Sequence, residues 1–254
     1  MRWRNVWILL MLMVFIAGLG TLLYPFIQGA VVDRQIAMNA QAFLEGQEPQ
    51  QQSQTEIVPD STEETEPEIT VPDRYPELRA AMLDYNSRIW EERQSGLCDP
   101  WSYEQPSFDL AEYGISNEVF GVISIPKLQL EMPIFLGATS KHMADGAAHL
   151  SQTSLPVGGN NTNCVIAGHR GYNGASYFRY ITDLQAGDTV TITNLWETIS
   201  YTVVSTDIIE PSNVGKILIQ ENREMLTLLT CHPYASGGRQ RYVVYCERNQ
   251  EMEV

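Results

Sequence analysis

The sequence has few basic residues for its length. Its 254 residues include 31 Asp and Glu but only 16 Lys and Arg, which gives a formal net charge of −15. Lys and Arg bind phosphate backbones, so this balance argues against a nucleic-acid-binding protein. Four cysteines are too few for a disulfide scaffold. A hydrophobic content of 44% is enough to build a core, which excludes disorder throughout the chain.

Several widespread catalytic motifs are also missing. The chain has no GxxxxGK[ST] phosphate loop, no GxGxxG, no HExxH and no GxSxG. The pairs Cys164/His169 and Cys231/His232 do not have the spacing of metal ligands, so we expect no metal and no other cofactor. Nucleophilic chemistry is the class of enzymatic activity that remains.

Charge is absent between Arg4 and Asp33, and residues 7–17 are continuously apolar. About 20 apolar residues suffice for a helix to cross a bilayer, so the segment predicts a transmembrane anchor. Arg2 and Arg4 precede it, which by the positive-inside rule places the N-terminus in the cytoplasm and the remainder outside. A secretory signal cleaved near residues 29–30 is the alternative. Both interpretations export the rest of the chain.

The acidic excess is concentrated in one segment. From Glu45 to Asp73 there are nine acids and no base. Such a composition predicts a disordered spacer, with an acidic interaction tail as the alternative. We therefore expect a cytoplasmic tip and anchor at 1–32, a juxtamembrane helix at 33–45, the linker at 46–73, a helix and loop at 74–114, a catalytic β domain at 115–248 and a tail at 249–254.

Order is expected to return with a helix that begins near Pro76 and ends by Gly96. Its apolar residues recur at near-helical spacing: Leu78, Met82, Ile89 and Trp90. After it come short runs of β-branched or aromatic residues separated by turn residues, a pattern typical of strands. These runs lie at 119–126, 132–137, 163–169, 188–194, 199–209, 224–231 and 241–246. Seven or more strands predict a mainly β domain, closed or sandwich-like.

Cys231 is the best candidate nucleophile, because it ends a predicted strand before a loop rich in Pro and Gly. Cys98 lies in a loop, whereas Cys164 and Cys246 lie within apolar strands and are expected to be inert core residues. A disulfide among the exported cysteines stays open as an alternative.

A reactive thiol needs a base or a positive charge nearby. His169 ends a predicted strand and is the preferred base. His232 is next to Cys231 in sequence, but neighbouring strand residues point to opposite faces. His142 is expected on a surface helix, and His149 is expected to make a structural hydrogen bond.

A developing oxyanion needs a donor, and Arg241 starts the strand across the loop from Cys231. A guanidinium at that place could bind substrate carbonyls or the oxyanion. A surface role is equally compatible with the sequence, and Arg239 is the competing candidate.

These residues carry a family resemblance. TLLTC at 227–231 resembles the TLxTC signature of sortases, the membrane-anchored cysteine transpeptidases of Gram-positive bacteria. Other segments occur in the family's order: GVISIPK (121–127), MPIFLG (132–137), GAAHLSQTSLPVGG (146–159), AGHRG (167–171), DLQAGD (183–188) and CHPY (231–234). The resemblance covers roughly residues 85–248.

The resemblance implies a closed sortase-type barrel of about eight strands, with N-terminal helices and one transmembrane helix. It implies that Cys231, His169 and Arg241 are catalytic and that Thr230 supports the substrate or the oxyanion. Asp99, Pro100 and Trp101 resemble the lid of class C sortases, which polymerise pilins. In that subclass the Asp approaches the catalytic Arg and the aromatic residue covers the Cys.

The implied reaction is cleavage of an LPxTG-like sorting signal between Thr and Gly through a thioacyl-enzyme. The acyl group then passes to an amine, with a pilin Lys expected. The alternatives are a housekeeping sortase that uses a cell-wall peptide amine, a cysteine hydrolase, and an inactive binding module. Expected partners are LPxTG-type surface or pilin proteins, at the outer face of the cell membrane.

Overall fold

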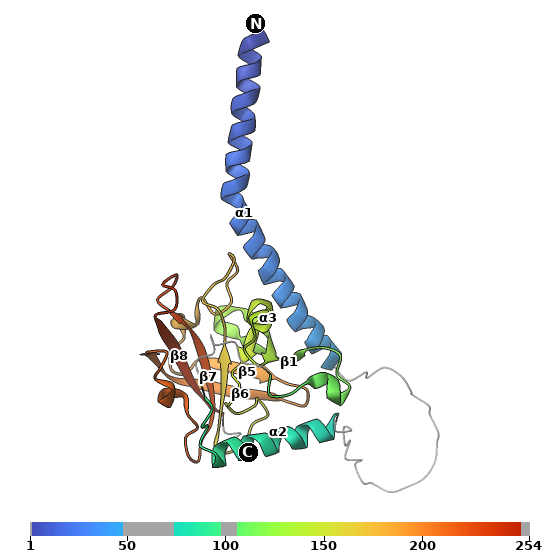
Figure 1. The fold of residues 1–254 in the computed structure, drawn as a ribbon, viewed down its shortest axis with the longest axis vertical. Helices are drawn as coiled ribbons and strands as arrows, with labels where there is room; N and C mark the ends of the chain where they lie inside the picture. Colours follow the sequence, from blue (N-terminus) through green and yellow to red (C-terminus); the bar gives the residue numbers. More distant parts are fainter. Residues whose placement is uncertain (1, 48–73, 98–105, 250–254) are drawn as a thin grey trace, which may run out of the picture.

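The computed structural model describes residues 2–47, 74–97 and 106–249, and eight strands close into a barrel (Figure 1). The order around the barrel is β1-β2-β3-β4-β7-β8-β6-β5. The prediction of a mainly β barrel of about eight strands is confirmed. The strands are β1 (Val119–Ile125), β2 (Leu130–Leu136), β3 (Ala147–His149), β4 (Thr162–Ala167), β5 (Thr189–Thr193), β6 (Thr198–Ile209), β7 (Glu224–His232) and β8 (Gln240–Arg248).

Two strand pairs are parallel, β2 with β3 and β4 with β7, and the other pairs are antiparallel. Sequence analysis finds seven of the eight strands and misses β3, because three residues are too few to show an alternating pattern. The β4–β7 pair is the important one for function, because the carboxyl-terminal ends of parallel strands lie next to each other.

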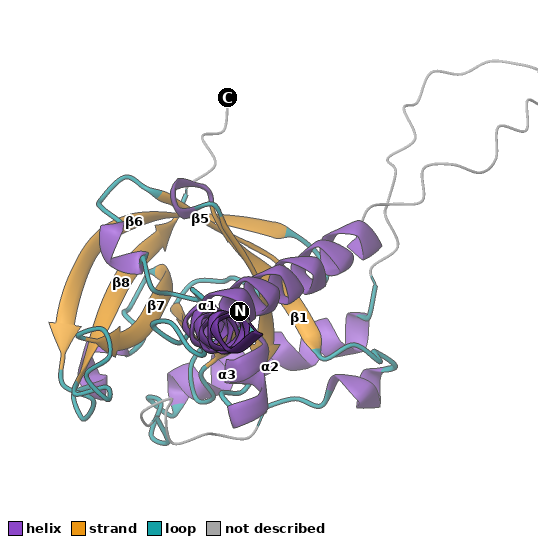
Figure 2. Ribbon diagram, turned by 90° about the horizontal axis from the view of Figure 1, so that it is seen from above, coloured by secondary structure: helices purple, strands orange, loops and turns teal. Residues whose placement is uncertain are grey.

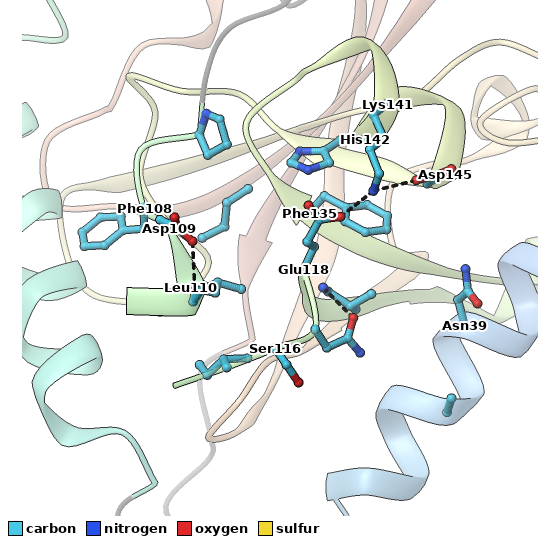
Figure 3. A pocket seen from close by; sticks show the side chains of 17 residues that line it. Asn39, Phe108, Asp109, Leu110, Ser116, Glu118, Phe135, Lys141, His142 and Asp145 are labelled. Atoms are coloured by element: carbon cyan, nitrogen blue, oxygen red, sulfur yellow. Dashed lines mark hydrogen bonds and ion pairs between the residues drawn. The ribbon is translucent and has the colours of Figure 1, made fainter. Parts of the chain in front are cut away.

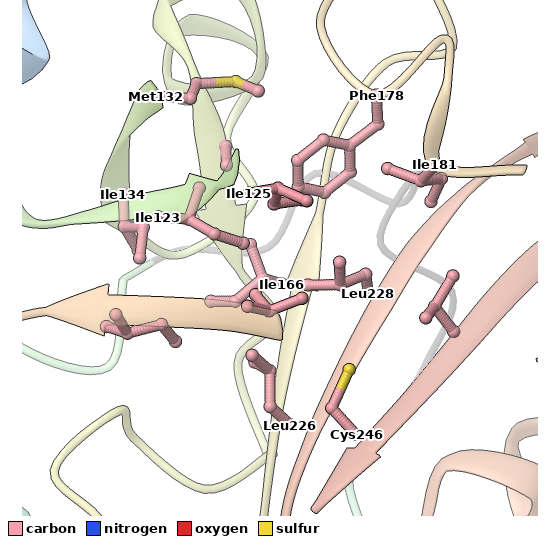
Figure 4. Packing of buried hydrophobic residues seen from close by; sticks show 14 of the residues in the cluster. Ile123, Ile125, Met132, Ile134, Ile166, Phe178, Ile181, Leu226, Leu228 and Cys246 are labelled. Carbon is pink, nitrogen blue, oxygen red and sulfur yellow. The ribbon is translucent and has the colours of Figure 1, made fainter. Parts of the chain in front are cut away.

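The barrel interior is filled by aliphatic and aromatic side chains from the strands and from the loop before β5 (Figure 4). Side chains alternate along each strand, so Cys164 and Ile166 of β4 belong to this interior cluster. Val165 and Ala167 belong to a second cluster on the outer face of the same strand. This alternation decides which residues reach the outer face, where the candidate site lies.

The helix α1 (Arg2–Gln47) is continuous, so the predicted anchor and juxtamembrane helix form one element. Residues 5–27 are exposed, and the helix is long and apolar enough to cross a membrane. Its second part runs beside β1 and β2 (Figures 1 and 2). That part buries Ile36, Ala40 and Phe43, which share one helix face.

The helix α2 (Pro76–Glu91) forms where the sequence predicts it and buries Leu78, Met82 and Ile89, while Trp90 is half-buried. The predicted linker lies almost wholly outside the described residues. The remaining helices are short: α3 (Ser140–Asp145) and the 3-10 helices η2 (Leu110–Tyr113), η3 (Pro126–Leu128), η4 (Ile181–Asp183) and η5 (Val214–Ile217).

Candidate active site

Cys231 and Arg241 are direct partners in the antiparallel register of β7 and β8. The Nη1 atom of Arg241 lies 3.9 Å from the Cys231 Sγ and donates to the carbonyl oxygens of Gly238 (2.7 Å) and Gln240 (3.1 Å). Arg241 is only 4% exposed, whereas its competitor Arg239 is exposed. A fixed positive charge beside a thiol stabilises the thiolate, the nucleophilic form.

His169 follows the end of β4, next to the end of β7. Ala167 pairs with Leu229 in the parallel register, and the Gly168 N–H continues the ladder by donating to the Leu229 carbonyl at 3.0 Å. Parallel strands advance equally per residue, so continuing this register brings His169 level with Cys231. Two predicted site residues therefore come from neighbouring strand ends, although they are far apart in sequence.

The imidazole of His169 is held between two aromatic rings. It stacks on Tyr172, with centroids 4.6 Å apart, and meets the edge of Tyr177 at 5.6 Å. Burial lowers the pKa of His169, which favours the neutral imidazole that can accept a proton. Gly168, the residue before it, lies close to the Phe178 ring, because a Cβ on Gly168 would lie 2.7 Å from that ring.

Thr230 connects the two strand ends. Its buried hydroxyl donates to the Gly168 carbonyl at 2.7 Å, so it fixes the backbone just before His169. Alternation along β7 turns its side chain to the face opposite that of Cys231. A role for Thr230 in supporting the substrate or the oxyanion stays a prediction.

His232 lies on the other side of β7 from Cys231, as the alternation argument predicts. The Nη1 atom of Arg170 donates to the His232 Nδ1 at 2.6 Å. Burial, and secondly the charge of Arg170, lowers the pKa of His232. This histidine therefore interacts with the loop after His169.

The other two histidines have structural contacts. The expectation that His142 lies on a surface helix is wrong for its side chain, which is buried, stacks on Phe135 and has its Nδ1 2.8 Å from the Gly137 oxygen. His149 is fully buried, with its Nε2 3.0 Å from the Ser154 oxygen. Burial lowers the pKa of His149 to about 4.

Of the three remaining cysteines, two lie in the core and the third lies outside the described residues. Cys164 and Cys246 are buried free cysteines of the barrel interior, as predicted. Burial raises the pKa of both thiols, that of Cys246 to about 12. Cys98 and the predicted lid, residues 99–101, lie outside the described residues. Within the described part of the chain, no His, Cys, Asp and Glu side chains gather in a group of three or more that could hold a metal ion.

An apolar cluster covers the barrel face that bears Cys231 and Arg241, and we call it the outer-face cluster. Leu229 precedes Cys231 by two residues and Val243 follows Arg241 by two, so alternation places all four on one face. Leu97, the last residue described before the predicted lid, packs against this cluster. Its members are Ala138, Met143, Ala148, Leu150, Val165, Ala167, Ile209, Ile217, Leu229 and Val243.

A cavity of about 860 Å³ lies elsewhere, between α1, the segment 106–118 and α3 (Figure 3). Its charged groups are already paired, because Lys141 contacts both Glu118 and Asp145. Among the described residues of the predicted site, Cys231, His169, Arg241 and Thr230 do not line this cavity. The candidate active site is therefore the junction of β4, β7 and β8.

Comparison with known proteins points to one family. A sortase domain model matches residues 123–249, half of the chain. The chain belongs to the sortase family. Sortase C1 of GBS pilus island 1 is 28% identical, with a TM-score of 0.63, and the match covers 73% of this chain and 88% of that one. Sortase C-3 from Streptococcus pneumoniae is 32% identical, with a TM-score of 0.61 and coverage of 69% and 83%.

A further relative of this sortase is sortase D from Bacillus subtilis, 28% identical over 135 residues. That match covers 52% of this chain and 65% of the relative, just under two thirds of its length. Family membership makes this chain a member of a family of transpeptidases, and the solved structures it resembles include pilus sortases.

In this sortase the loop after His169 is docked on α1, which sequence reasoning misses. The carboxylate of Asp33 accepts hydrogen bonds from the Ser176 backbone N–H (2.8 Å) and hydroxyl (3.3 Å). A Cβ on Gly29 would lie 2.4 Å from the Gly174 backbone, so α1 and the loop are in direct backbone contact there. The sequence signal is an isolated acid after the apolar stretch and a glycine within the loop.

Proposed function

We propose that this sortase is a membrane-anchored cysteine transpeptidase that uses Cys231, His169 and Arg241. The observation that carries the proposal is the pairing of Cys231 with a buried guanidinium at the strand end next to His169. A binding module would not by itself need a fixed cation at this place, whereas a cysteine hydrolase would share it and differs only in the acceptor of the second step. The family match supports the same chemistry.

In the first half-reaction, the Cys231 sulfur attacks the Thr carbonyl carbon of an LPxTG-like signal. The Cys231 thiol gives its proton to His169 as the C–S bond forms, and His169 passes that proton to the departing amine as the Thr–Gly C–N bond breaks. Arg241 opposes the negative charge that develops on the carbonyl oxygen, together with backbone N–H groups.

In the second half-reaction, an amine nitrogen attacks the thioester carbon and gives its proton to His169. The new C–N bond forms as the C–S bond breaks, which returns Cys231 as the thiolate. Transfer to an amine in place of water requires that water be poorly placed in the thioacyl-enzyme.

The acceptor we propose is a pilin Lys, because the similar solved structures include sortases of pilus islands. A cell-wall peptide amine is the alternative. A lid formed by Asp99, Pro100 and Trp101 is proposed to cover Cys231 at rest, and the packing of Leu97 against the outer-face cluster supports this path. Arg2 and Arg4 before the apolar helix support an N-terminus in the cytoplasm and a barrel outside.

The test is capture of the thioacyl-enzyme. After incubation with an LPxTG peptide, the intact mass of the protein should increase by the acyl fragment. Cys231→Ala should abolish the adduct, while the core variant Cys246→Ala should retain it. An adduct on Cys231→Ala would contradict the assignment of the nucleophile. No adduct on the native protein would favour a binding module. With an amine acceptor added, a product with only a free carboxylate would favour a hydrolase.

A further inference from the structure

Most basic side chains of the barrel have an acidic partner. Five of them form ion pairs: Lys127, Lys141, Lys216, Arg223 and Arg248. Arg170 and Arg179 form no ion pair with any residue in the described ranges. The same holds for Arg239, but that side chain is exposed, whereas Arg170 and Arg179 are half-buried. In a chain where acids outnumber bases by almost two to one, half-buried arginines without an acidic partner are unusual. We call these two side chains the cationic rim.

Arg170 bonds only to neutral groups. Its Nη1 donates to the His232 Nδ1 at 2.6 Å and its Nη2 donates to the Thr182 hydroxyl at 3.5 Å. The Nε atom is buried and has no hydrogen-bond partner. A guanidinium has five N–H donors, so this half-buried side chain keeps a further N–H on each Nη atom beyond these two bonds.

Arg179 has the same kind of surroundings. Its Nη2 donates to the Tyr234 hydroxyl at 3.1 Å, its guanidinium carbon lies 5.0 Å from that ring's centroid, and its Nε is also buried and unbonded. A Cβ on Gly171 would lie 2.7 Å from this Nη2, so the guanidinium rests against the backbone next to Arg170. The two cations therefore share one seam between the loop after β4 and the loop after β7.

This seam lies just beyond the reacting groups. Arg170 follows His169 directly, and its partner His232 follows Cys231 directly. The outer-face cluster lies on the other side of Cys231, along the strands. If the signal peptide runs along this face of the strands towards Cys231, the departing amine and the incoming amine lie at the seam.

We propose that the cationic rim is a subsite for a carboxylate carried by the acceptor amine. Planar guanidinium groups bind carboxylates through paired N–H donors, which matches the unused donors of both side chains. The same positive charge lowers the pKa of an approaching ammonium group, so it favours the neutral amine that can attack. The inference rests on the proposed function and specifies the chemistry of its acceptor.

The first experiment measures binding without chemistry, on the full chain with Cys231→Ala. The probes are Nα-acetyl-lysine and Nα-acetyl-lysinamide, which carry the same ε-amine and differ in the carboxylate. A second pair, acetyl-Lys-Glu-amide and acetyl-Lys-Gln-amide, moves the carboxylate to a neighbouring side chain. In titrations followed by NMR, at least one acid should bind about tenfold more tightly than its neutral match, the effect of one charge-assisted hydrogen bond.

The ratio of the affinity for the acid to that for its neutral match should fall to near one in Arg170→Gln and in Arg179→Gln. It should persist in the control Arg223→Gln, which removes an arginine just before β7, at the opposite end of that strand from Cys231. The ratio of two affinities does not depend on the fraction of folded protein. Equal binding of acid and amide would overturn the inference, as would a preference that survives both rim variants. The probe pair that shows the preference identifies where the carboxylate lies.

The second experiment compares transfer to the same acceptors by the native enzyme. The acid-to-amide ratio of transfer rates should match the ratio of affinities and should fall in the rim variants. If the binding preference is found but no thioacyl-enzyme forms, the proposed function fails and the carboxylate subsite stands. If transfer occurs with no preference in binding or rate, the function stands and the subsite is wrong.

Discussion

The outer-face cluster and the cationic rim lie on two sides of the same thiol and differ in almost every physical property. The cluster is a continuous set of buried apolar side chains from β4, β7 and β8 and the elements around them. The rim consists of two arginines held by neutral partners. Apolar surface binds by area and shape, whereas a guanidinium selects charge and geometry.

The difference suggests a division of labour between the two substrates. The signal peptide would be recognised along the strands, and the acceptor amine would be recognised by the loops after them. Cys231 lies between the outer-face cluster and the cationic rim. His169 lies beside it, with aromatic rings packed against its imidazole. Changes on one side should therefore alter one half-reaction more than the other.

The largest expected effect concerns which histidine, His169 or His232, acts as the acid–base group beside Cys231. His169→Ala should slow thioacyl formation by about 10²–10⁴-fold, the usual contribution of a positioned acid–base group. His232→Ala should slow it much less, because this ring contacts Arg170 on the other side of β7. Stopped-flow release of a fluorescent leaving group measures both rates. A larger effect at His232 would refute the argument from strand faces.

A second prediction concerns the stability of the segment that contributes Ala148 and Leu150 to the outer-face cluster. His149 lies between two members of that cluster, Ala148 and Leu150, and its pKa in the folded chain is about 4. The unfolded chain binds a proton near the usual value of about 6.5, so it gains protons first as the pH falls. The stability contributed above pH 6.5 is therefore lost between about pH 6.5 and 4, up to about 3 kcal/mol.

Urea unfolding at pH 7 and pH 4.5 measures this loss. In His149→Gln the difference between the two pH values should shrink by about 2–3 kcal/mol, even if the variant is less stable at both. An unchanged difference would mean that His149 titrates normally in the folded protein.

The smallest expected effect concerns the predicted lid. Changing Asp99 and Trp101 to Ala should speed alkylation of Cys231 several-fold, because a cover over the outer-face cluster would be removed. Asp84→Ala, an exposed acid on α2, is the matched control. Mass spectrometry of the labelled peptide gives the rates. Equal rates in all three proteins would show that no closed lid shields the thiol.

The barrel was predictable because its strands carry alternating runs of apolar residues. The places of Cys231, His169 and Arg241 at strand ends were predictable because each lies at the end of such a run, and their catalytic roles stay a prediction. Register then explains why the structure brings these three strand ends together. The short β3 was not predictable, since three residues show no periodicity. The burial of His142 depends on packing against Phe135, which no local pattern reports.

Contacts between distant segments account for the other omissions. Arg170 reads in sequence as a loop arginine, and only the fold shows its contact with His232. Tyr172 and Tyr177 flank His169 because their loop folds back, as the hydrogen bond from the Phe178 N–H to the His169 carbonyl shows. Side chains that hold a reactive group can come from any segment, so spacing alone does not find them.

The docking of α1 on the loop after His169 determines how far the candidate active site of the proposed anchored enzyme lies from the membrane. The unbroken exposed stretch of α1 ends at residue 27, and the Asp33–Ser176 contact comes six residues later. At 1.5 Å per residue that is roughly 9 Å along the helix. A rigid stem of this length keeps the catalytic loop near the lipid headgroups, so substrates must reach the enzyme close to the membrane surface.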